Sequence, residues 1–133
     1  MGRALLGRRT VLVVDDDPFI RTLLVAGLQE AGYRVVTADD GQQALDQIRR
    51  ERPDVVLLDL MMPKLDGYSV ARIIRLQDDT RRLPIIVLSA DVRAPQKLNG
   101  VRIDGYLSKP FDLDEVLARV SEYAPLDEIS SAV

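Results

Sequence analysis

The apolar run at residues 55–58, which ends at Asp59, constrains the fold more than any other feature of the sequence. Four apolar residues without polar alternation are too few for an independent helix and are typical of a parallel strand buried on both faces. In open α/β sheets, ligands bind at the carboxyl ends of the strands. Asp59 would lie at such an end, either as a cap for the following turn or as a functional group, and this stretch alone leaves both open.

The composition limits the chemistry available to the chain. Its 133 residues, 47% apolar and 29% charged, suit a single globular domain. The sequence contains no Cys and no His, which excludes disulfides, thiol catalysis, His general bases and metal sites built on either residue. The net charge of −3 argues against a nucleic-acid surface. No signal peptide or membrane-spanning stretch is recognisable, so we expect a cytoplasmic protein whose chemistry depends on carboxylates, hydroxyls, Lys and Arg.

Further short apolar runs alternate with segments of helical periodicity. In addition to residues 55–58, we expect strands at residues 11–14, 35–37, 84–88 and 104–108. Four helices are expected with recognisable ends. The first runs from Pro18, with Asp17 as its N-cap, to a cap at Gly32, and the second covers residues 41–50. The third follows a cap at Asp66, and the last runs from a capping box at Asp112 and Glu115 to Pro125. Five strands alternating with helices predict a doubly wound α/β sheet with right-handed crossovers.

The fourth helical segment, residues 91–100, is the weakest element. It contains Pro95 and Gly100 and has little apolar periodicity, so we expect a short or irregular helix there. Residues 1–9 are expected to form a flexible basic arm and residues 125–133 a frayed C-terminal tail, which leaves residues 10–124 as the domain.

Polar side chains follow four of the five expected strands at their carboxyl ends. Asp15 and Asp16 follow the first strand, Asp59 the third, Ser89 the fourth and Lys109 the fifth. Because the carboxyl ends of parallel strands share one edge of a sheet, these groups are expected to converge. Three converging carboxylates raise each other's pKa, and a hard divalent cation with oxygen ligands, such as Mg²⁺, relieves their repulsion. Each residue alone has a structural explanation as a cap or a surface group. The presence of all of them at the same end of successive strands favours a functional site.

Four motifs in this order carry a resemblance to a known family. They are residues 11–18, residues 54–63 with Asp66 and Gly67, residues 84–90 and residues 105–111. From residue 10 to residue 124 the sequence resembles the receiver domain of two-component response regulators. The resemblance implies a flavodoxin-like (βα)5 fold, with a five-stranded parallel sheet in the order 2-1-3-4-5, and a role in phosphorelay signal transduction.

The resemblance implies a Mg²⁺-dependent phosphorylation site. Asp59 would become the aspartyl phosphate of a phosphoprotein, with the phosphoryl group supplied by a partner sensor histidine kinase or phosphotransfer protein. Asp16 and Asp59 would ligate Mg²⁺ directly, the Met61 backbone carbonyl would be a third ligand, and Asp15 would act mainly through a bound water. An ionised carboxylate needs no general base, so the absence of His from this chain is no obstacle.

The same resemblance assigns roles to the ends of the last two strands. Ser89 would hydrogen-bond the phosphoryl group and Lys109 would pair with it. Lys109–Pro110 is expected to be a cis peptide bond that directs Lys109 into the site. Tyr106 matches an aromatic residue that rotates in the family: when phosphate draws Ser89 inward, Tyr106 fills the vacated space and reshapes the output surface.

Two departures from the family pattern bear on output and on phosphate lifetime. The interval from Ser89 to Lys109 is about two residues shorter than in chemotaxis-type receivers, and the shortfall lies in the fourth helix, part of the family's usual output and dimerisation face. Met61, two residues beyond the acceptor, cannot orient an attacking water, whereas Asp91, two residues beyond Ser89, is a candidate. We expect a moderately long-lived aspartyl phosphate with autophosphatase activity, in a protein that is otherwise not an enzyme.

Two rival functions remain open from the sequence. A haloacid-dehalogenase-like phosphatase also uses a strand-end Asp and Mg²⁺, but it needs a second acid where this chain has Met61, and no cap domain is recognisable in this sequence. Alternatively, a receiver-like fold could serve only for protein binding, without phosphorylation. No output domain follows the last helix, so we expect a stand-alone receiver or part of a longer protein. Its output partner is unidentified, direct nucleic-acid binding is not expected, and homodimerisation on phosphorylation is an open question.

Overall fold

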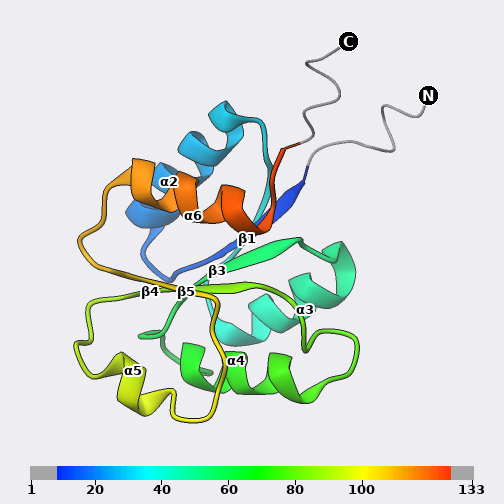
Figure 1. Ribbon diagram of the computed structural model, residues 1–133, viewed down its shortest axis with the longest axis vertical. Coiled ribbons are helices and arrows are strands. Elements are labelled where there is room, and N and C mark those ends of the chain that lie inside the picture. The colour runs from blue at the N-terminus through cyan, green and yellow to red at the C-terminus, as the bar shows by residue number, and fades with distance from the viewer. Residues whose placement is uncertain (1–8, 127–133) are drawn as a thin grey trace.

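The computed structural model describes residues 9–126, in which strands and helices alternate along the chain (Figure 1). In chain order they are β1 (Thr10–Val14), α2 (Pro18–Ala31), β2 (Arg34–Ala38), α3 (Gly41–Glu51), β3 (Val55–Asp59), α4 (Gly67–Leu76), β4 (Ile85–Ser89), α5 (Ala94–Lys97), β5 (Gly105–Ser108) and α6 (Leu113–Tyr123). Residues 1–8 of the expected arm and residues 127–133 of the expected tail lie outside the described residues.

The five strands form one parallel sheet in the order β2-β1-β3-β4-β5, which confirms the predicted flavodoxin-like topology. The register aligns the strand ends. Val14 pairs with Leu58, so the residues that follow them, Asp15 and Asp59, reach the same level of the sheet. Ser89 pairs with Ser108, so Lys109 comes directly after the last pair of β4 and β5. One edge of the sheet therefore collects the candidate residues from four strands.

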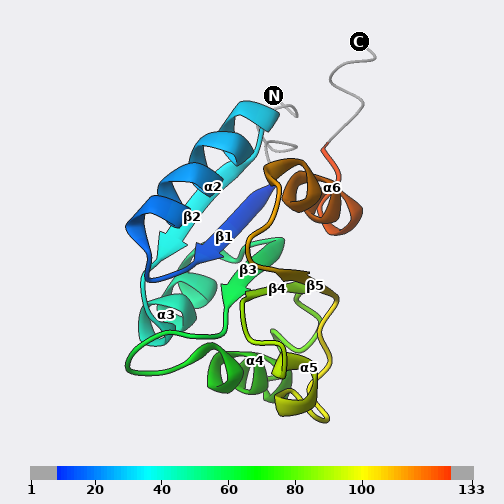
Figure 2. The ribbon, with the colours of Figure 1, turned by 90° about the vertical axis from the view of Figure 1, so that its left-hand side faces the viewer.

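Helices cover both faces of the sheet (Figure 2). One face carries α2 and α6, and the other carries α3, α4 and α5. Successive residues of a central strand enter opposite layers: Leu12 and Leu58 pack in the core beneath α3 and α4, whereas Val13 and Leu57 pack in the core beneath α2 and α6. Burial on both faces explains why the central strands are unbroken apolar runs in the sequence.

Acidic side chains fix where several helices begin. Asp17, Asp40 and Asp66 each accept a hydrogen bond from a backbone N–H in the first turn of α2, α3 and α4, at 2.9, 2.8 and 2.8 Å. At α6 the Glu115 carboxylate accepts the Asp112 backbone N–H at 3.1 Å. The caps at Asp17, Asp66 and Asp112 confirm the sequence analysis, whereas the cap at Asp40 was not predicted.

Some details differ from expectation. The fourth helix is only four residues long, as expected. However, β5 begins at Gly105 rather than at residue 104, because the Asp104 carboxylate accepts the Ile85 N–H at 2.8 Å. Leu23 stands at helical spacing with the buried Leu24 and Leu28 of α2, but it is 39% exposed because it borders an open groove with Pro110.

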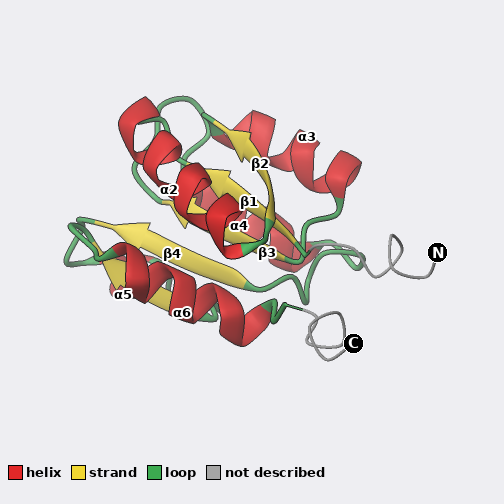
Figure 3. Cartoon of the chain, turned by 90° about the horizontal axis from the view of Figure 1, so that it is seen from above, coloured by secondary structure: helices red, strands yellow, loops and turns green. Residues whose placement is uncertain are grey.

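The two ends of the described chain meet on the side of the domain from which β4 starts, away from the candidate residues (Figure 3). There the Arg9 guanidinium donates to the Pro125 carbonyl oxygen at 3.1 Å. Among residues 9–126, no helix combines the length and apolar character needed to cross a membrane.

Candidate functional site

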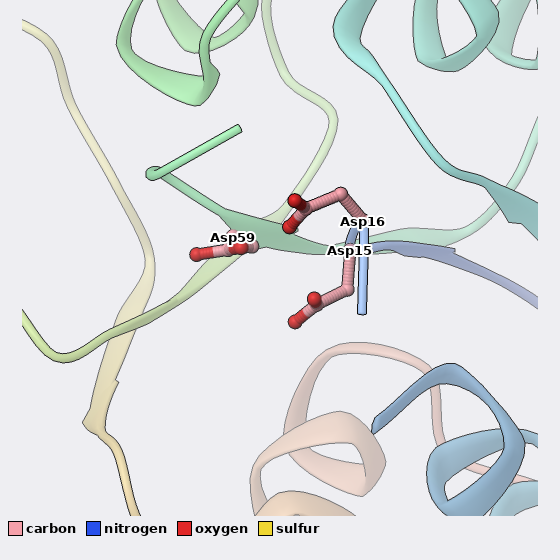
Figure 4. A group of neighbouring side chains, drawn as sticks. All are labelled: Asp15, Asp16 and Asp59. Carbon is pink, nitrogen blue, oxygen red and sulfur yellow. The ribbon is translucent and has the colours of Figure 1, made fainter. Parts of the chain in front are cut away.

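Three aspartates from two neighbouring strands converge at the carboxyl edge of the sheet (Figure 4). Asp15 and Asp16 directly follow β1, and Asp59 is the last residue of β3. One carboxylate oxygen of each lies within 4.8 Å of the other two. Asp15 and Asp59 are 0% and 3% exposed, whereas Asp16 is open to solvent. The three acids that follow strand ends in the sequence are thus neighbours in space.

Lys109 reaches the same cluster from the end of β5. Its ammonium nitrogen lies 2.8 Å from Asp15 Oδ2 and 3.6 Å from Asp59 Oδ2. Its backbone N–H donates to the Ser89 carbonyl oxygen at 2.9 Å, which extends the pairing of β4 and β5 by one residue. The Lys109–Pro110 peptide bond is cis, as expected. A cation therefore faces both buried carboxylates.

Burial dominates the electrostatics of Asp59. The pKa of Asp59 is raised to about 6, and burial is the largest cause. The Met61 N–H, 3.1 Å from Oδ1, lowers this pKa. The charge of Asp15 raises it, and the charge of Lys109 lowers it. The sequence predicts mutual repulsion as the cause, but burial contributes more than the neighbouring acids. Burial also opposes the charged form of Lys109, yet the hydrogen bond to Asp15 and the charge of Asp59 outweigh it and raise the pKa of Lys109.

The backbone of Asp91 connects Ser89 with Tyr106. Ser89 is fully buried, and its Oγ accepts the Asp91 N–H at 3.0 Å. The Tyr106 hydroxyl donates to the Asp91 carbonyl oxygen at 3.2 Å. The two residues expected to form a switch therefore share one hydrogen-bonding neighbour.

The side chain of Asp91 has partners that the sequence analysis did not identify. Its Oδ2 accepts hydrogen bonds from Lys97 Nζ at 2.8 Å and from the Tyr68 hydroxyl at 2.9 Å, and its Oδ1 accepts the Arg93 N–H at 2.9 Å. Lys97 Nζ also lies 5.8 Å from the centroid of the Tyr68 ring. The hydrogen bonds from Lys97, Arg93 and Tyr68 lower the pKa of Asp91 to about 2. The only signal in the sequence was the scarcity of lysine, of which the chain has three.

Comparison with known proteins decides the family. Residues 11–121 match the family described as the response regulator receiver domain. The chain belongs to this family. All four motifs of the resemblance lie wholly or largely within the matched residues.

Full-length relatives of this receiver domain are about twice as long. It is 47% identical over 112 residues to the response regulator MprA of Mycolicibacterium vanbaalenii, an alignment that covers 83% of this chain and 48% of MprA. It is 41% identical over 125 residues to the alkaline phosphatase synthesis transcriptional regulatory protein PhoP of Bacillus subtilis, which covers 92% of this chain and 51% of PhoP. The chain therefore spans about half the length of the curated relatives it matches.

Solved receiver structures share the fold. The receiver domain of the sensor histidine kinase PA1611 from Pseudomonas aeruginosa, crystallised with a magnesium ion coordinated in its active site cleft, matches with a TM-score of 0.81 at 36% identity, covering 88% of this chain and 98% of that one. The chemotaxis response regulator CheY4 of Vibrio cholerae matches with a TM-score of 0.81 at 33% identity, covering 87% and 98%.

The donor set of this receiver domain fits Mg²⁺. The acids offer only carboxylate oxygens, and the open side at Asp16 leaves room for the waters that Mg²⁺ retains. Both oxygens of Asp15 already accept hydrogen bonds, from the Asp17 N–H at 2.9 Å and from Lys109 at 2.8 Å. Asp15 is thus better suited to act through a water than as a direct ligand. Met61 follows Asp59 by two residues and is 57% exposed.

Proposed function

We propose that this receiver domain acts in phosphorelay signalling by accepting a phosphoryl group on Asp59 from a partner sensor histidine kinase or phosphotransfer protein. The convergence of Lys109 with the three aspartates at one edge of the sheet carries the proposal. Asp59 is one of the two buried carboxylates of this group, and a pKa of about 6 leaves it mainly ionised at neutral pH. An ionised carboxylate is a competent nucleophile without a general base.

The transfer would replace one bond to phosphorus with another. A carboxylate oxygen of Asp59 would attack the phosphorus atom, the P–O bond of the acyl phosphate would form, and the P–N bond of the donor's phosphohistidine would break. The leaving imidazole nitrogen would take up a proton from water. Lys109, now 3.6 Å from Asp59 Oδ2, would pair with a phosphoryl oxygen, and the Ser89 hydroxyl would donate to another.

The acidic cluster would hold the metal that this reaction requires. Asp16, Asp59 and the Met61 carbonyl would ligate Mg²⁺ directly, with Asp15 acting through a water. When bound, Mg²⁺ would offset the negative charge that the phosphoryl group brings to the cluster. The chain's own contribution is to present two buried carboxylates and one exposed carboxylate in fixed positions.

The output would arise where Ser89 and Tyr106 meet at Asp91. If Ser89 turns toward the phosphoryl group, its Oγ moves away from the Asp91 N–H that it now accepts at 3.0 Å. Tyr106, bound to the carbonyl of the same residue, would respond and change the surface beside the short α5. This couples a local charge to a change at the surface.

A phosphorylation experiment separates this function from its rivals. We expect the protein with Mg²⁺ to bind beryllofluoride stoichiometrically and to be labelled by acetyl phosphate, and Asp59→Asn to abolish both. Asp78→Asn, which changes a carboxylate that is 99% exposed, is the matched control and should leave both intact. Continuous turnover of the phosphate donor would instead indicate a haloacid-dehalogenase-like phosphatase, and neither binding nor labelling would indicate a protein-binding module. Equal labelling of Asp59→Asn and the parent would contradict the proposal.

The proposal extends to location and output. We propose a cytoplasmic protein, because its kinase or phosphotransfer partner would need cytoplasmic ATP as the phosphate source. Several curated relatives are named as transcriptional regulators, and this chain spans about half of their length. Transcriptional control through an output partner or a linked domain is therefore the proposed output, while the receiver itself, with a net charge of −3, is not proposed to bind nucleic acid.

A further inference from the structure

The loop between β3 and α4, residues 60–66, begins directly after Asp59 and carries Met61. Two helices start against this loop, α3 at Gly41 and α4 at Gly67. Both glycines are buried. A side chain at either position would have to displace neighbouring atoms, and most of these atoms belong to the loop or to the residue before it.

Gly67 lies against the backbone of the acceptor. A Cβ atom built at Gly67 would overlap the Asp59 carbonyl oxygen and would lie 2.6 Å from Leu60 Cα and 3.0 Å from the Asp59 carbonyl carbon. The Gly67 N–H also donates to the Leu60 carbonyl oxygen at 3.2 Å. Backbone atoms cannot rotate away as the end of a flexible side chain can, so a side chain at Gly67 would shift either α4 or the segment that contains Asp59.

Gly41 holds the other end of the loop. A Cβ atom there would overlap the Leu65 carbonyl oxygen and would lie 2.9 Å from Leu65 Cβ. The preceding residue, Asp40, pairs with Lys64 of the same loop at 3.5 Å. The loop is therefore fixed by close backbone approach at both ends and by an ion pair between them.

We infer that Gly67 and Gly41 are positioning residues for the acceptance of phosphate, because they allow the two helix starts to press the 60–66 loop into place beside Asp59. The inference rests on the proposed function, since the reaction being positioned is the phosphorylation of Asp59. Neither glycine touches the reacting atoms; each acts through the loop. A misplacement of about 1 Å can slow a positioned reaction by about a hundredfold, so one added methyl group at either glycine is a sensitive test.

The test compares three Gly→Ala variants. Gly67→Ala and Gly41→Ala change the loop contacts. The control is Gly27→Ala in the middle of α2, where the Cβ atom would lie 2.6 Å from Leu113 Cδ2, a side chain of the α2–α6 packing. Alanine is a better helix former than glycine, so a loss in any of the three must come from steric overlap. For each variant we would measure the free energy of unfolding with urea, the Mg²⁺ dissociation constant by calorimetry, and the rate of labelling against acetyl phosphate concentration.

We expect both loop variants to weaken Mg²⁺ binding and to slow labelling at saturating acetyl phosphate by about tenfold or more beyond any effect of Gly27→Ala. Losses no larger than those of Gly27→Ala would overturn the inference. If Gly67→Ala does not fold, the inference is tested by comparing Gly41→Ala with Gly27→Ala in Mg²⁺ binding and labelling rate. Should wild-type Asp59 remain unlabelled, the proposed function fails, but the Mg²⁺ dissociation constants still show whether the glycines position the cluster.

Discussion

Lys109 is paired with Asp15: its ammonium nitrogen lies 2.8 Å from Asp15 Oδ2, nearer than the 3.6 Å that separates it from Asp59 Oδ2. Asp15 is fully buried and would otherwise be a buried charge without a cation beside it. Lys109 therefore compensates one acid of the cluster while it remains within reach of the other. This geometry allows it to turn toward a phosphoryl oxygen on Asp59 without leaving the site.

Replacing Lys109 tests this dual role. We expect Lys109→Gln to slow labelling of Asp59 by acetyl phosphate by about a hundredfold or more, because a preorganised charge at the developing phosphoryl group is lost. Arg81→Gln is the matched control, since Arg81 is 58% exposed and pairs with Asp78 outside both the acidic cluster and the 60–66 loop. Labelling of Lys109→Gln at the parent rate would show that the cation does not act on the phosphoryl group.

The raised pKa of Asp59 makes the stability of the protein depend on pH. Its ordinary pKa of 3.8 becomes about 6 after folding, so the folded state holds its proton more tightly than the unfolded chain does. Unfolding free energy therefore falls as the pH rises from about 4 to about 6, by up to about 3 kcal/mol for this group. Without Mg²⁺, Asp59→Asn should be more stable than the parent above pH 6 and equal to it below pH 4. Urea unfolding of both proteins across this range checks the difference, and a difference that does not vary with pH would contradict a raised pKa for Asp59.

The sheet and its functional edge could be predicted from the sequence because both depend on local pattern. Each central strand is an unbroken apolar run, and Asp15, Asp59, Ser89 and Lys109 stand directly at or after the end of one. Strand ends of a parallel sheet must share an edge, so convergence followed from chain order alone. The short α5 was likewise foreseeable from Pro95 and the missing apolar period.

Contacts made across the fold could not be predicted. Tyr68 is 23 residues from Asp91, and Lys97 is 6 residues from it, a spacing that no regular helix brings together. Gly67 belongs to a motif that the sequence shows, but its close contact with the Asp59 backbone depends on how α4 packs against β3. The share of burial in the pKa of Asp59 also depends on packing that no local pattern contains.

Lys97 should control the protonation of Asp91. Its hydrogen bond is the largest cause of the lowered pKa of Asp91, about 2 against an ordinary 3.8. Because the folded pKa is depressed, the stabilising effect of this carboxylate is present above about pH 4 and is lost as the pH falls toward 2. In carbon-detected NMR titrations we expect the Asp91 midpoint to rise toward 3.8 in Lys97→Gln and to stay unchanged in Lys64→Gln. An unchanged midpoint in Lys97→Gln would mean that the ion pair does not form in solution.

The lifetime of the aspartyl phosphate depends on which side chain can orient an attacking water. Met61 follows the acceptor by two residues and offers no hydrogen bond from its 57% exposed side chain. Asp91, the other candidate, already accepts Lys97 and Tyr68 on Oδ2 and the Arg93 N–H on Oδ1. We therefore expect Met61→Asn, which adds an amide at the open position, to speed autodephosphorylation by about threefold to tenfold through orientation of the water.

Asp91→Asn keeps the shape of the side chain and provides the comparison for that lifetime. Both carboxylate oxygens of Asp91 already accept hydrogen bonds, so we do not expect them to orient the attacking water. This variant should therefore change the decay rate of phosphorylated Asp59 by less than about twofold. Both rates follow from the loss of radioactive phosphate from the purified phosphoprotein with Mg²⁺. A slow decay in Asp91→Asn together with an unchanged rate in Met61→Asn would assign the water to Asp91 instead, and would require its bonds to Lys97 and Tyr68 to open once Asp59 carries phosphate.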